Sequence, residues 1–548
     1  ALEFALQTSP SLGLSLAEQL TFLTLACAAG AIAPLPGVLL RQRPVGAGLG
    51  LLVALHVTVG WRTGVGVNLS LREPQVIGTL VALVLGSLAA GIALNRLVEK
   101  VEKLFYPMAG GAALLGLLLG RPLAPLPAEG PNLVLVSLDT TRADRLGPYG
   151  GPAQTPNLQR LADEGVLFEQ AIATAPLTEP SHLSILTGLR TTTTGVVANG
   201  TPLGEQPDLL SHRLKAEGLR TGAVVSGFPL HSHWGWQQGF DVFDDDFGRL
   251  AGMHQLSLVQ AIDQVLLRTN LREREGEGVL RRGRTFLDRN RRGRFFLWAH
   301  FFDPHAPYER FDVASAPRDG EALDLPDWWP EAHRGVTDPD WLVRAYDAEI
   351  EYVDALLGEL LDELPPNTLV VVVADHGESL TEHGYLFEHG DELYDPSLRV
   401  PLLLWWPEGL EPGVVPCQVS TVDIAPTIEE LLGLPPVASD GRSLVGLQEV
   451  CEDVPAIATT LGARHVEEPP LHTALRTPEL KLLDRAGELS LFDLVSDPGE
   501  LRPVEDAERQ DRALELLDAT ITGRAPLQPQ DLDNPEVMET LRALGYME

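Results

Sequence analysis

Long apolar runs without charge dominate the beginning of the chain. A helix needs roughly 20 mostly apolar residues to cross the hydrocarbon core of a bilayer, with about 17 as the lower end. Four charge-free stretches meet or approach that length, at 19–40, 45–61, 76–95 and 105–120. Buried helices of a water-soluble domain are the alternative, but four in succession with short connectors are hard to pack around one core. The pattern therefore predicts an α-helical membrane bundle of about four helices over residues 1–121.

Charged residues beside these stretches predict the orientation of the bundle. Acidic Glu3 and Glu18 precede the first stretch in place of basic residues, so we expect it to remain as an anchor and not to be cleaved as a signal peptide. The first and third connectors hold most of the basic residues, which places them in the cytoplasm. We therefore expect a multi-pass protein of the cell membrane, with everything after Gly120 on the extracytoplasmic side.

Beyond residue 121 the pattern changes to short apolar runs that alternate with amphipathic segments. Prolines recur in 122–131 and predict a stiff, extended linker. Runs rich in β-forming residues follow, at 132–138, 221–225, 294–300, 368–374 and 400–406. Helical patterns lie between them, at 157–164, 209–217, 345–364 and 422–432. The alternation predicts an α/β domain over 132–436, with a mostly parallel central sheet flanked by helices.

The last part of the chain has a different pattern. Short strand-sized pieces follow one another between His472 and Leu494, at 474–476, 481–483 and 489–492. Strands joined by such short turns pair antiparallel. We therefore expect a small antiparallel subdomain over residues 437–548.

The charge balance narrows the class of partner. The 548 residues include 76 acidic and 41 basic ones, which gives a formal net charge of −35. A chain this acidic is repelled by nucleic-acid backbones. Its Arg-rich stretch, 268–294, alternates with acidic residues in the way that an exposed helix face does. We therefore expect no nucleic-acid partner.

The few cysteines leave two alternatives open. Cys417 and Cys451 both fall beyond the predicted membrane region. A disulfide between them would suit an oxidising compartment, whereas two buried thiols would behave as small apolar residues. The sequence alone does not decide between these alternatives.

Residues that can act in chemistry follow two of the predicted strands. Asp139 comes directly after the first strand, and Asp375 and His376 come directly after the fourth. Because ligands gather outside the carboxyl ends of parallel strands, we expect these side chains at one edge of the sheet. Thr178 stands just before a helix-like run, where a nucleophile would lie. Two carboxylates, one imidazole and one hydroxyl suit a divalent cation such as zinc, manganese, magnesium or calcium.

These residues lie in a series of motifs that resembles the sulfatase family of the alkaline-phosphatase superfamily. The series reads SLDTTRADRLGPYG, TPNLQRLADEGVLFEQAIATAPLTEPSHLSILTGLR, WAHFFDPHAPY, VVVADHGESLTEHGYLFEHGDELYDPSLRVPLLLWWP, STVDIAPTIEELLGL and LFDLVSDPGE. It begins near Pro131 and does not include the predicted membrane region. The resemblance implies an alkaline-phosphatase-like fold and hydrolysis of a sulfate, phosphate or phosphonate ester.

The resemblance also implies roles for individual residues. One divalent metal ion, of unspecified identity, is expected on Asp139, Thr178, Asp375 and His376. Thr178 is also the expected nucleophile. The resemblance further implies catalytic groups at the oxyanion or leaving group, His305 and His389, and substrate contacts from His182 and Asn199.

Departures from the family pattern bear on the substrate. The sulfatase motif is C-x-P-S-R or S-x-P-S-R, whose first residue is oxidised to formylglycine; Thr178 and His182 occupy its first and last positions here. Threonine cannot form that aldehyde. The lysines that usually hold sulfate are missing from the motifs, and Thr140 replaces a second aspartate. A threonine hydroxyl attacks only when a cation stabilises its alkoxide, so these departures shift weight toward phosphoryl substrates.

Three functions are compatible with the sequence. The first is a membrane-anchored, sulfatase-like, metal-dependent hydrolase that acts outside the cytoplasm. The second is a cell-envelope phosphotransferase of the phosphoglycerol or phosphoethanolamine type, since membrane-anchored relatives with a catalytic threonine are of that kind. The third is a non-catalytic, sulfatase-like binding module. Competent ligands at every expected metal position favour an enzyme, and the sulfatase-like C-terminal motifs favour the hydrolase. The expected partners are the lipid bilayer and an ester substrate, which an envelope component could supply; the oligomeric state stays open.

Overall fold

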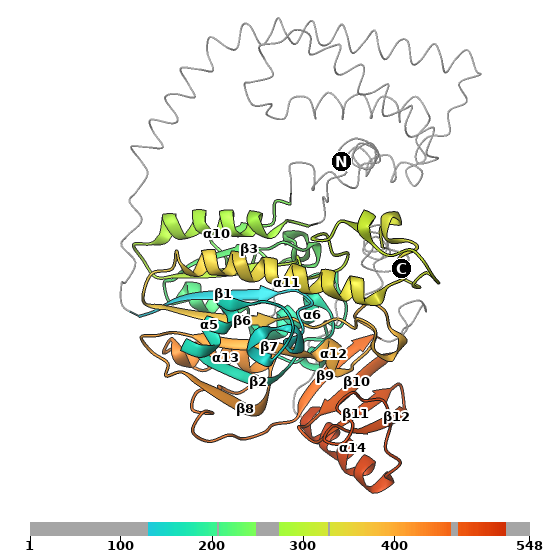
Figure 1. Ribbon diagram of the computed structural model, residues 1–548. Coiled ribbons are helices and arrows are strands. Elements are labelled where there is room, and N and C mark those ends of the chain that lie inside the picture. The colour runs from blue at the N-terminus through green and yellow to red at the C-terminus, as the bar shows by residue number, and fades with distance from the viewer. Residues whose placement is uncertain (1–129, 205–207, 248–272, 327–328, 462–469, 522–548) are drawn as a thin grey trace, which may run out of the picture. The chain divides into compact units, whose positions relative to one another are not determined.

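Two β-sheets organise the part of the chain that the computed structural model describes (Figure 1). This part comprises residues 130–204, 208–247, 273–326, 329–461 and 470–521. The predicted membrane bundle and most of the predicted linker lie outside these residues. Within them, no helix combines the length and the apolar character that crossing a bilayer requires.

The larger sheet has eight strands in the order β4-β3-β5-β1-β6-β7-β2-β8. Its neighbouring strands are parallel, except that β7 is antiparallel to both β6 and β2. β1 and β6 lie side by side at its centre and are buried on both faces, which explains their nearly continuous apolar sequences. The strands span Asn132–Leu138 (β1), Val166–Ile172 (β2), Arg220–Val224 (β3), Val242–Asp244 (β4), Phe295–Phe301 (β5), Thr368–Ala374 (β6), Arg399–Trp405 (β7) and Gly413–Ser420 (β8).

Helices cover both faces of this sheet. Leu297 of β5 faces α10 and the next residue, Trp298, faces α6, because successive strand residues point to opposite faces. α11 packs with α10 and α5 packs with α11, while α8 and α13 pack with α6 (Figure 1). The helices of this domain span Pro156–Glu164 (α5), Thr178–Thr187 (α6), Thr191–Thr194 (α7), Leu210–Ala216 (α8), Gly276–Asn290 (α10), Pro339–Leu361 (α11), Asp395–Leu398 (α12) and Ile424–Leu431 (α13).

The smaller sheet has four antiparallel strands in the order β12-β11-β10-β9. Its strands span Ala456–Leu461 (β9), Leu471–Arg476 (β10), Leu480–Arg485 (β11) and Glu488–Asp493 (β12). The helix α14 (Ala507–Ile521) packs on one face of it. The core between helix and sheet consists of Ile457, Leu475, Leu482, Leu491, Ala513 and Leu517.

The structure confirms the predicted α/β class, the mostly parallel central sheet and the antiparallel C-terminal sheet. The predicted strands at 132–138 and 368–374 coincide with β1 and β6. The sequence pattern did not identify β2, β4, β8 or β9. The apolar run of β2 is broken by Glu169 and Gln170, where its register shifts, and β8 is an edge strand that contains Pro416. The subdomain boundary at residue 437 stays a prediction.

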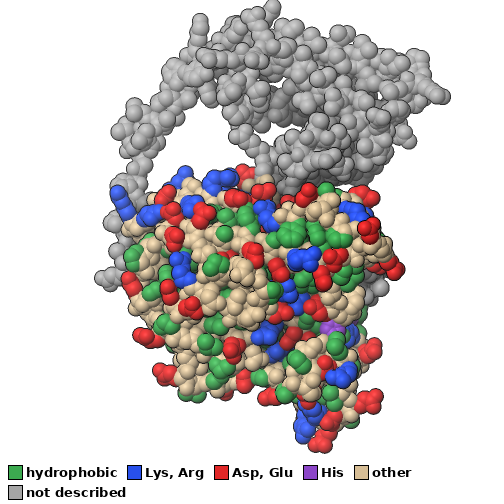
Figure 2. Space-filling model, in the orientation of Figure 1, with side chains coloured by type: hydrophobic (Ala, Val, Ile, Leu, Met, Phe, Trp, Pro, Cys, Tyr) green, Lys and Arg blue, Asp and Glu red, His purple; other side chains and the backbone are tan. Residues whose placement is uncertain are grey.

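Acidic and basic side chains are interspersed on the face of the molecule shown in Figure 2. In the Arg-rich segment, Arg282 pairs with Asp244 at 3.2 Å and Arg284 pairs with Glu359 at 3.0 Å. Acidic neighbours therefore offset part of the positive charge of α10. The exclusion of a nucleic-acid partner stays a prediction.

A disulfide joins Cys417 of β8 to Cys451, with 5.6 Å between the two Cα atoms. The structure therefore has the bridge, which was one of the two alternatives that the sequence left open. The bridge links the edge of the larger sheet to the segment that precedes β9.

Removing the bridge should destabilise the protein. The two cysteines are 34 residues apart, and closing a loop of that size restricts the unfolded chain enough to contribute about 3 kcal/mol. We expect a loss of that order in the free energy of unfolding of the Cys417→Ala/Cys451→Ala variant, measured by urea denaturation. Mass mapping of the native protein without reductant should find the two peptides linked. Two thiols that alkylate in the folded protein would contradict this.

Candidate active site

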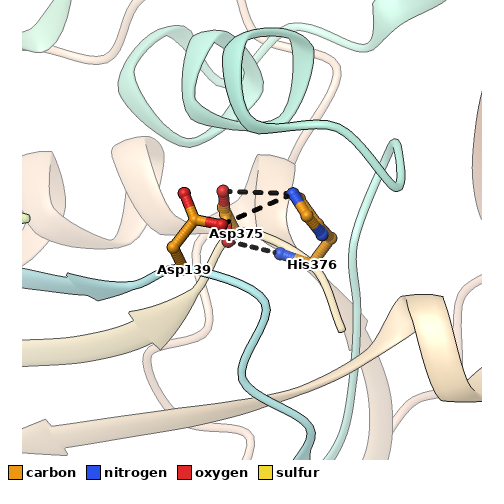
Figure 3. Close-up of side chains that lie close together, drawn as sticks. All are labelled: Asp139, Asp375 and His376. Atoms are coloured by element: carbon orange, nitrogen blue, oxygen red, sulfur yellow. Dashed lines mark hydrogen bonds and ion pairs between the residues drawn. The ribbon is translucent and has the colours of Figure 1, made fainter. Parts of the chain in front are cut away.

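Asp139, Asp375 and His376 meet at the carboxyl ends of two neighbouring strands. β1 and β6 pair in parallel with Leu138 opposite Ala374, so the residues that follow the two strands begin side by side. One ligand atom from each side chain lies within 4.8 Å of the others, and all three side chains are buried. Figure 3 shows the two carboxylates and the imidazole lying together at this edge.

The facing atoms of this cluster are all acceptors. Nδ1 of His376 lies 2.9 Å from the carbonyl oxygen of Gly377 and must donate to it, so Nε2 of the neutral ring carries a lone pair. Nε2 lies 3.4 Å from Oδ2 of Asp375 and 4.0 Å from Oδ1 of Asp139. None of these three atoms has a hydrogen-bond partner among the described residues. Buried acceptors that face one another are unfavourable unless a cation lies between them, so the residues fit a divalent metal ion.

Burial controls protonation in the cluster. It raises the pKa of Asp139 well above the usual value, and the negative charge of Glu378 raises it further. Burial and the charge of Asp139 likewise raise the pKa of Asp375. Burial, and after it the neighbouring His389, lower the pKa of His376 and keep its ring neutral. Without a cation the two carboxyls therefore tend to hold protons, which metal binding would release.

Neighbouring donors fix the two carboxylates. Oδ1 of Asp375 accepts the backbone N–H of Thr140 at 3.3 Å. Oδ2 of Asp139 lies 3.2 Å from Nε2 of His300. The backbone N–H of Ser226 donates to Nδ1 of His300 at 3.3 Å, so the proton sits on Nε2, which donates to Asp139. Burial lowers the pKa of His300 to about 3, which makes it a neutral donor.

Thr178 is the first residue of α6, and its hydroxyl faces the cluster. The preceding residue, Leu177, is extended, and Pro180 fits in the first helical turn, where no N–H bond is lost. Oγ1 of Thr178 lies 3.5 Å from Oδ2 of Asp139, and the side chain is buried. The N-terminal end of the helix carries positive partial charge, which favours an anionic group here. The structure therefore brings the predicted nucleophile to the predicted metal ligands.

His182 lies one turn after Thr178 but is enclosed by protein. Its Nδ1 lies 2.8 Å from the carbonyl oxygen of Thr178. Its Nε2 lies 2.9 Å from Oγ of Ser137, which also accepts the indole N–H of Trp298 at 2.9 Å. The side chain is fully buried and both ring nitrogens have protein partners. These bonds hold the first turn of α6 against β1 and β5, and the substrate contact predicted for His182 stays a prediction.

The two predicted catalytic histidines adjoin the cluster. The ring centre of His389 lies 4.6 Å from that of His376 and 4.9 Å from that of His305. Nδ1 of His389 lies 3.3 Å from Oε1 of Glu378, whose other oxygen accepts the hydroxyl of Tyr308 at 2.5 Å. Burial raises the pKa of Glu378 to about 7. A group bound at the cluster would therefore meet imidazoles on this side.

Asn199 lies beside the first turn of α6. Its Oδ1 accepts the backbone N–H of Glu179 at 2.9 Å. The carboxylate of Glu179 in turn accepts the backbone N–H groups of Gly200 and Thr201. These bonds fasten the 199–201 segment next to Thr178. The substrate contact predicted for Asn199 stays a prediction.

Sequence reasoning did not identify His300 or Tyr308 as part of the site. His300 lies near the end of a buried strand, and the pairing of β5 with β1 sets it opposite Ser137, close to Asp139. The sequence shows a polar residue near the end of an apolar strand, but this predicts a place in the site only when the order of the strands in the sheet is known. Tyr308 and its partner Glu378 are 70 residues apart, so no local spacing connects them.

Two family models match this part of the chain. The family model described as Sulfatase matches residues 131–434, which is more than half of the chain. A second model, described as N-sulphoglucosamine sulphohydrolase, C-terminal, matches residues 381–524 and so includes the smaller sheet.

Named relatives extend over most of the same region. The choline-sulfatase of Rhizobium meliloti is 27% identical over 426 residues, which cover 68% of this chain and 81% of the relative. The N-acetylglucosamine-6-O-sulfatase of Bacteroides thetaiotaomicron is 24% identical over 510 residues, covering 76% and 89%. The solved phosphonate monoester hydrolase of Agrobacterium radiobacter has the same fold, with a TM-score of 0.58 at 21% identity over 71% of this chain and 96% of that one. The chain therefore belongs to the sulfatase family of the alkaline-phosphatase superfamily and is an ester hydrolase of that family.

Proposed function

We propose that this enzyme cleaves a phosphate, phosphonate or sulfate ester with the hydroxyl of Thr178 as nucleophile, and that phosphoryl esters are the favoured class. One observation carries the proposal. Oγ1 of Thr178 lies at the start of α6, 3.5 Å from Asp139, beside the three buried acceptors that have no hydrogen-bond partner in the described residues. The sulfatase motif has a residue at this position that is oxidised to the aldehyde formylglycine, whereas this chain has a hydroxyl.

The residues of the site suit an in-line displacement. Oδ2 of Asp139 holds the hydroxyl proton of Thr178 in the resting site. Attack of Oγ1 on phosphorus would form a phosphothreonine as the ester oxygen departs, and His389 or His305 would protonate that oxygen. Water would then hydrolyse the phosphothreonine. The positive partial charge at the N-terminal end of α6 favours the negative charge of the transferred group.

The family's enzymes use a divalent metal ion, and the cluster fits one. Asp139, Asp375, His376 and Thr178 would hold it, and when bound it would supply positive charge next to the reacting oxygens. His300 and the backbone N–H of Thr140 keep the carboxylates in the orientation that such a site needs.

The side chains around the site favour phosphoryl over sulfuryl esters. Threonine cannot be oxidised to formylglycine, the group that sulfatases use. Among the described residues, Lys215 forms an ion pair with Asp241, and Lys481 forms ion pairs with Asp395 and Glu500. Neither lysine is therefore available to hold a sulfate. Both ester classes occur among the proteins compared, since two relatives are named for sulfate esters and the solved neighbour for phosphonate monoesters.

Transfer to an acceptor is the second candidate. The same phosphothreonine could pass its phosphoryl group to a hydroxyl or amine of an envelope component, and the predicted membrane bundle favours that setting. The match of residues 381–524 to a sulphohydrolase model favours water as the acceptor.

The substitution Thr178→Ala should abolish turnover. It removes the nucleophile but little packing volume, so we expect a fall in kcat of about 10⁴-fold or more with unchanged thermal stability. The measurement is the initial rate on a panel of aryl phosphates, phosphonates and sulfates. The matched Thr178→Ser variant keeps a hydroxyl and should retain part of the activity. Turnover by Thr178→Ala at the wild-type rate, or a trapped phosphoryl adduct that maps to another residue, would exclude Thr178 as nucleophile.

Removal of metal should make stability fall as the pH rises. The folded-state pKa values of Asp139 and Asp375 are raised, so above about pH 4 these two carboxyls bind more protons in the folded protein than in the unfolded chain. In chelator, they should therefore make the melting temperature fall as the pH rises above about 4, and saturating Mn²⁺ should remove this contribution, which the difference between the curves with and without Mn²⁺ measures. Asp139→Asn removes one of the two carboxylates and should flatten the curve in chelator. Identical curves with and without Mn²⁺ would argue against the metal site.

We further propose that residues 1–121 anchor the enzyme in the cell membrane and that the catalytic domain lies on the extracytoplasmic side. The bridge between Cys417 and Cys451 supports an oxidising location for that domain. The full chain should stay in the membrane fraction after an alkaline carbonate wash, should dissolve in detergent, and should be cleaved by protease added outside intact cells. Release by carbonate, or protection from external protease, would contradict the anchor or the orientation.

A further inference from the structure

The loop that carries His389, residues 377–394, runs from the end of β6 to the start of α12 and is bound at both ends. Its first part closes on itself, because Ser379 and Glu388 exchange backbone hydrogen bonds of 3.0 and 3.2 Å. The side chain of Glu378 contacts Nδ1 of His389 at 3.3 Å. Arg142, outside the loop, donates to the carbonyl oxygen of Glu378 at 3.2 Å and to Oε1 of Glu382 at 2.8 Å, so the rest of the larger domain also holds the cluster side of the loop.

The part of the loop that follows His389 is bound by the smaller C-terminal sheet. Every strand of that sheet contributes a side chain to it or to Asp395, the residue where α12 begins. These side chains are Thr460 of β9, Arg476 of β10, Lys481 and Arg485 of β11, and Phe492 of β12.

Buried charges anchor the end of the loop. Nζ of Lys481 lies 3.2 Å from the carbonyl oxygen of Leu393, 2.5 Å from Oδ1 of Asp395 and 2.7 Å from Oε1 of Glu500. Arg476 donates to both oxygens of Asp395, at 3.0 and 2.9 Å. A buried ion pair is costly to break when one partner is removed, so the smaller sheet holds this end of the loop in one arrangement.

The contact nearest to the catalytic histidine comes from Thr460. Its hydroxyl donates to the carbonyl oxygen of Gly390, the residue directly after His389. Gly390 has φ 107°, a conformation that other residues rarely adopt, so this peptide plane is set by its surroundings. The bond is fully buried, and it holds the peptide group that follows Gly390, which is one Cα atom away from the peptide group that His389 shares with Gly390.

We propose that the C-terminal sheet is a positioning element of the active site, with Thr460 as the positioning residue that sets the place of His389 through Gly390. The inference rests on the proposed function of His389 as a proton donor to the leaving oxygen. The smaller sheet is then part of the catalytic apparatus, although none of its side chains need touch the substrate.

The neighbouring Thr459 supplies a matched control. It lies on the same strand, is equally buried and loses the same hydroxyl when changed to valine, but it donates to Oγ1 of Thr191 at 2.6 Å and not to the loop. The test compares kcat and KM of the full-length Thr460→Val and Thr459→Val enzymes. The substrates are a nitrophenyl phosphate, whose nitrophenolate leaves without protonation, and an alkyl phosphate, whose departing oxygen must be protonated.

Thr460→Val should lower kcat for the alkyl ester about 10-fold or more and for the nitrophenyl ester much less, with KM unchanged, because general acid catalysis contributes about 10²–10⁴-fold. Thr460→Ser keeps the hydroxyl and should restore the wild-type pattern, and Thr459→Val should affect both substrates equally and slightly. A Thr460→Val enzyme with the profile of Thr459→Val overturns the inference.

Two further variants keep the test decisive. His389→Ala should lower kcat for the alkyl ester more than Thr460→Val does, and for the nitrophenyl ester much less. If His389→Ala does not discriminate between the two esters, the proposed role of His389 fails. If His389→Ala discriminates between them but Thr460→Val does not, only the positioning role of Thr460 is overturned. If Thr460→Val does not fold, Arg485→Gln removes the half-buried 2.8 Å contact to Glu392 and should shift kcat in the same direction. Its control is Arg512→Gln, which breaks an exposed pair within α14; equal effects of these two variants overturn the inference.

Discussion

Three buried acceptor atoms that face one another at the ends of β1 and β6 are the constraint on which the rest of the site depends. The parallel register of the two strands places Asp139 and Asp375 together and leaves His376 beside them with its lone pair turned inward. Such an arrangement persists in a folded protein when a cation holds it together. The neighbouring donors, His300 and the backbone N–H of Thr140, satisfy the outer oxygens and leave the inner ones for the cation.

The proposed nucleophile, Thr178, is placed by the same arrangement. His182 bonds the first turn of α6 to β1 through Ser137, and this fixes Thr178 with its hydroxyl toward Asp139. Since a threonine offers a hydroxyl and no aldehyde, the proposed mechanism keeps the metal ligands expected from the sulfatase family and changes the attacking group. The fold therefore indicates ancestry more directly than substrate, and the side chain at position 178 carries the argument for phosphoryl esters.

The metal cluster was predictable from sequence because its members directly follow strands with long apolar runs, and parallel strands end at one edge of a sheet. The groups that hold its carboxylates in place were not predictable from the sequence. His300 reaches Asp139 only through the order of β5 and β1, and the network of Lys481, Asp395 and Glu500 depends on packing between two sheets. His182 was expected at the substrate because of its place in the motif; the fold bonds it to Thr178 and Ser137 in the core, and the motif alone does not reveal these contacts. The predicted membrane bundle lies outside the described residues.

A crystal structure of the full chain grown with Mn²⁺ and orthovanadate, a mimic of the phosphoryl group in transfer, tests the central claim most directly. We predict anomalous density for manganese between Asp139, Asp375 and His376, in contact with Oγ1 of Thr178, and vanadium bonded to that same oxygen. Manganese elsewhere in the protein, or vanadate held at the cluster through water with Thr178 turned away, would contradict the account.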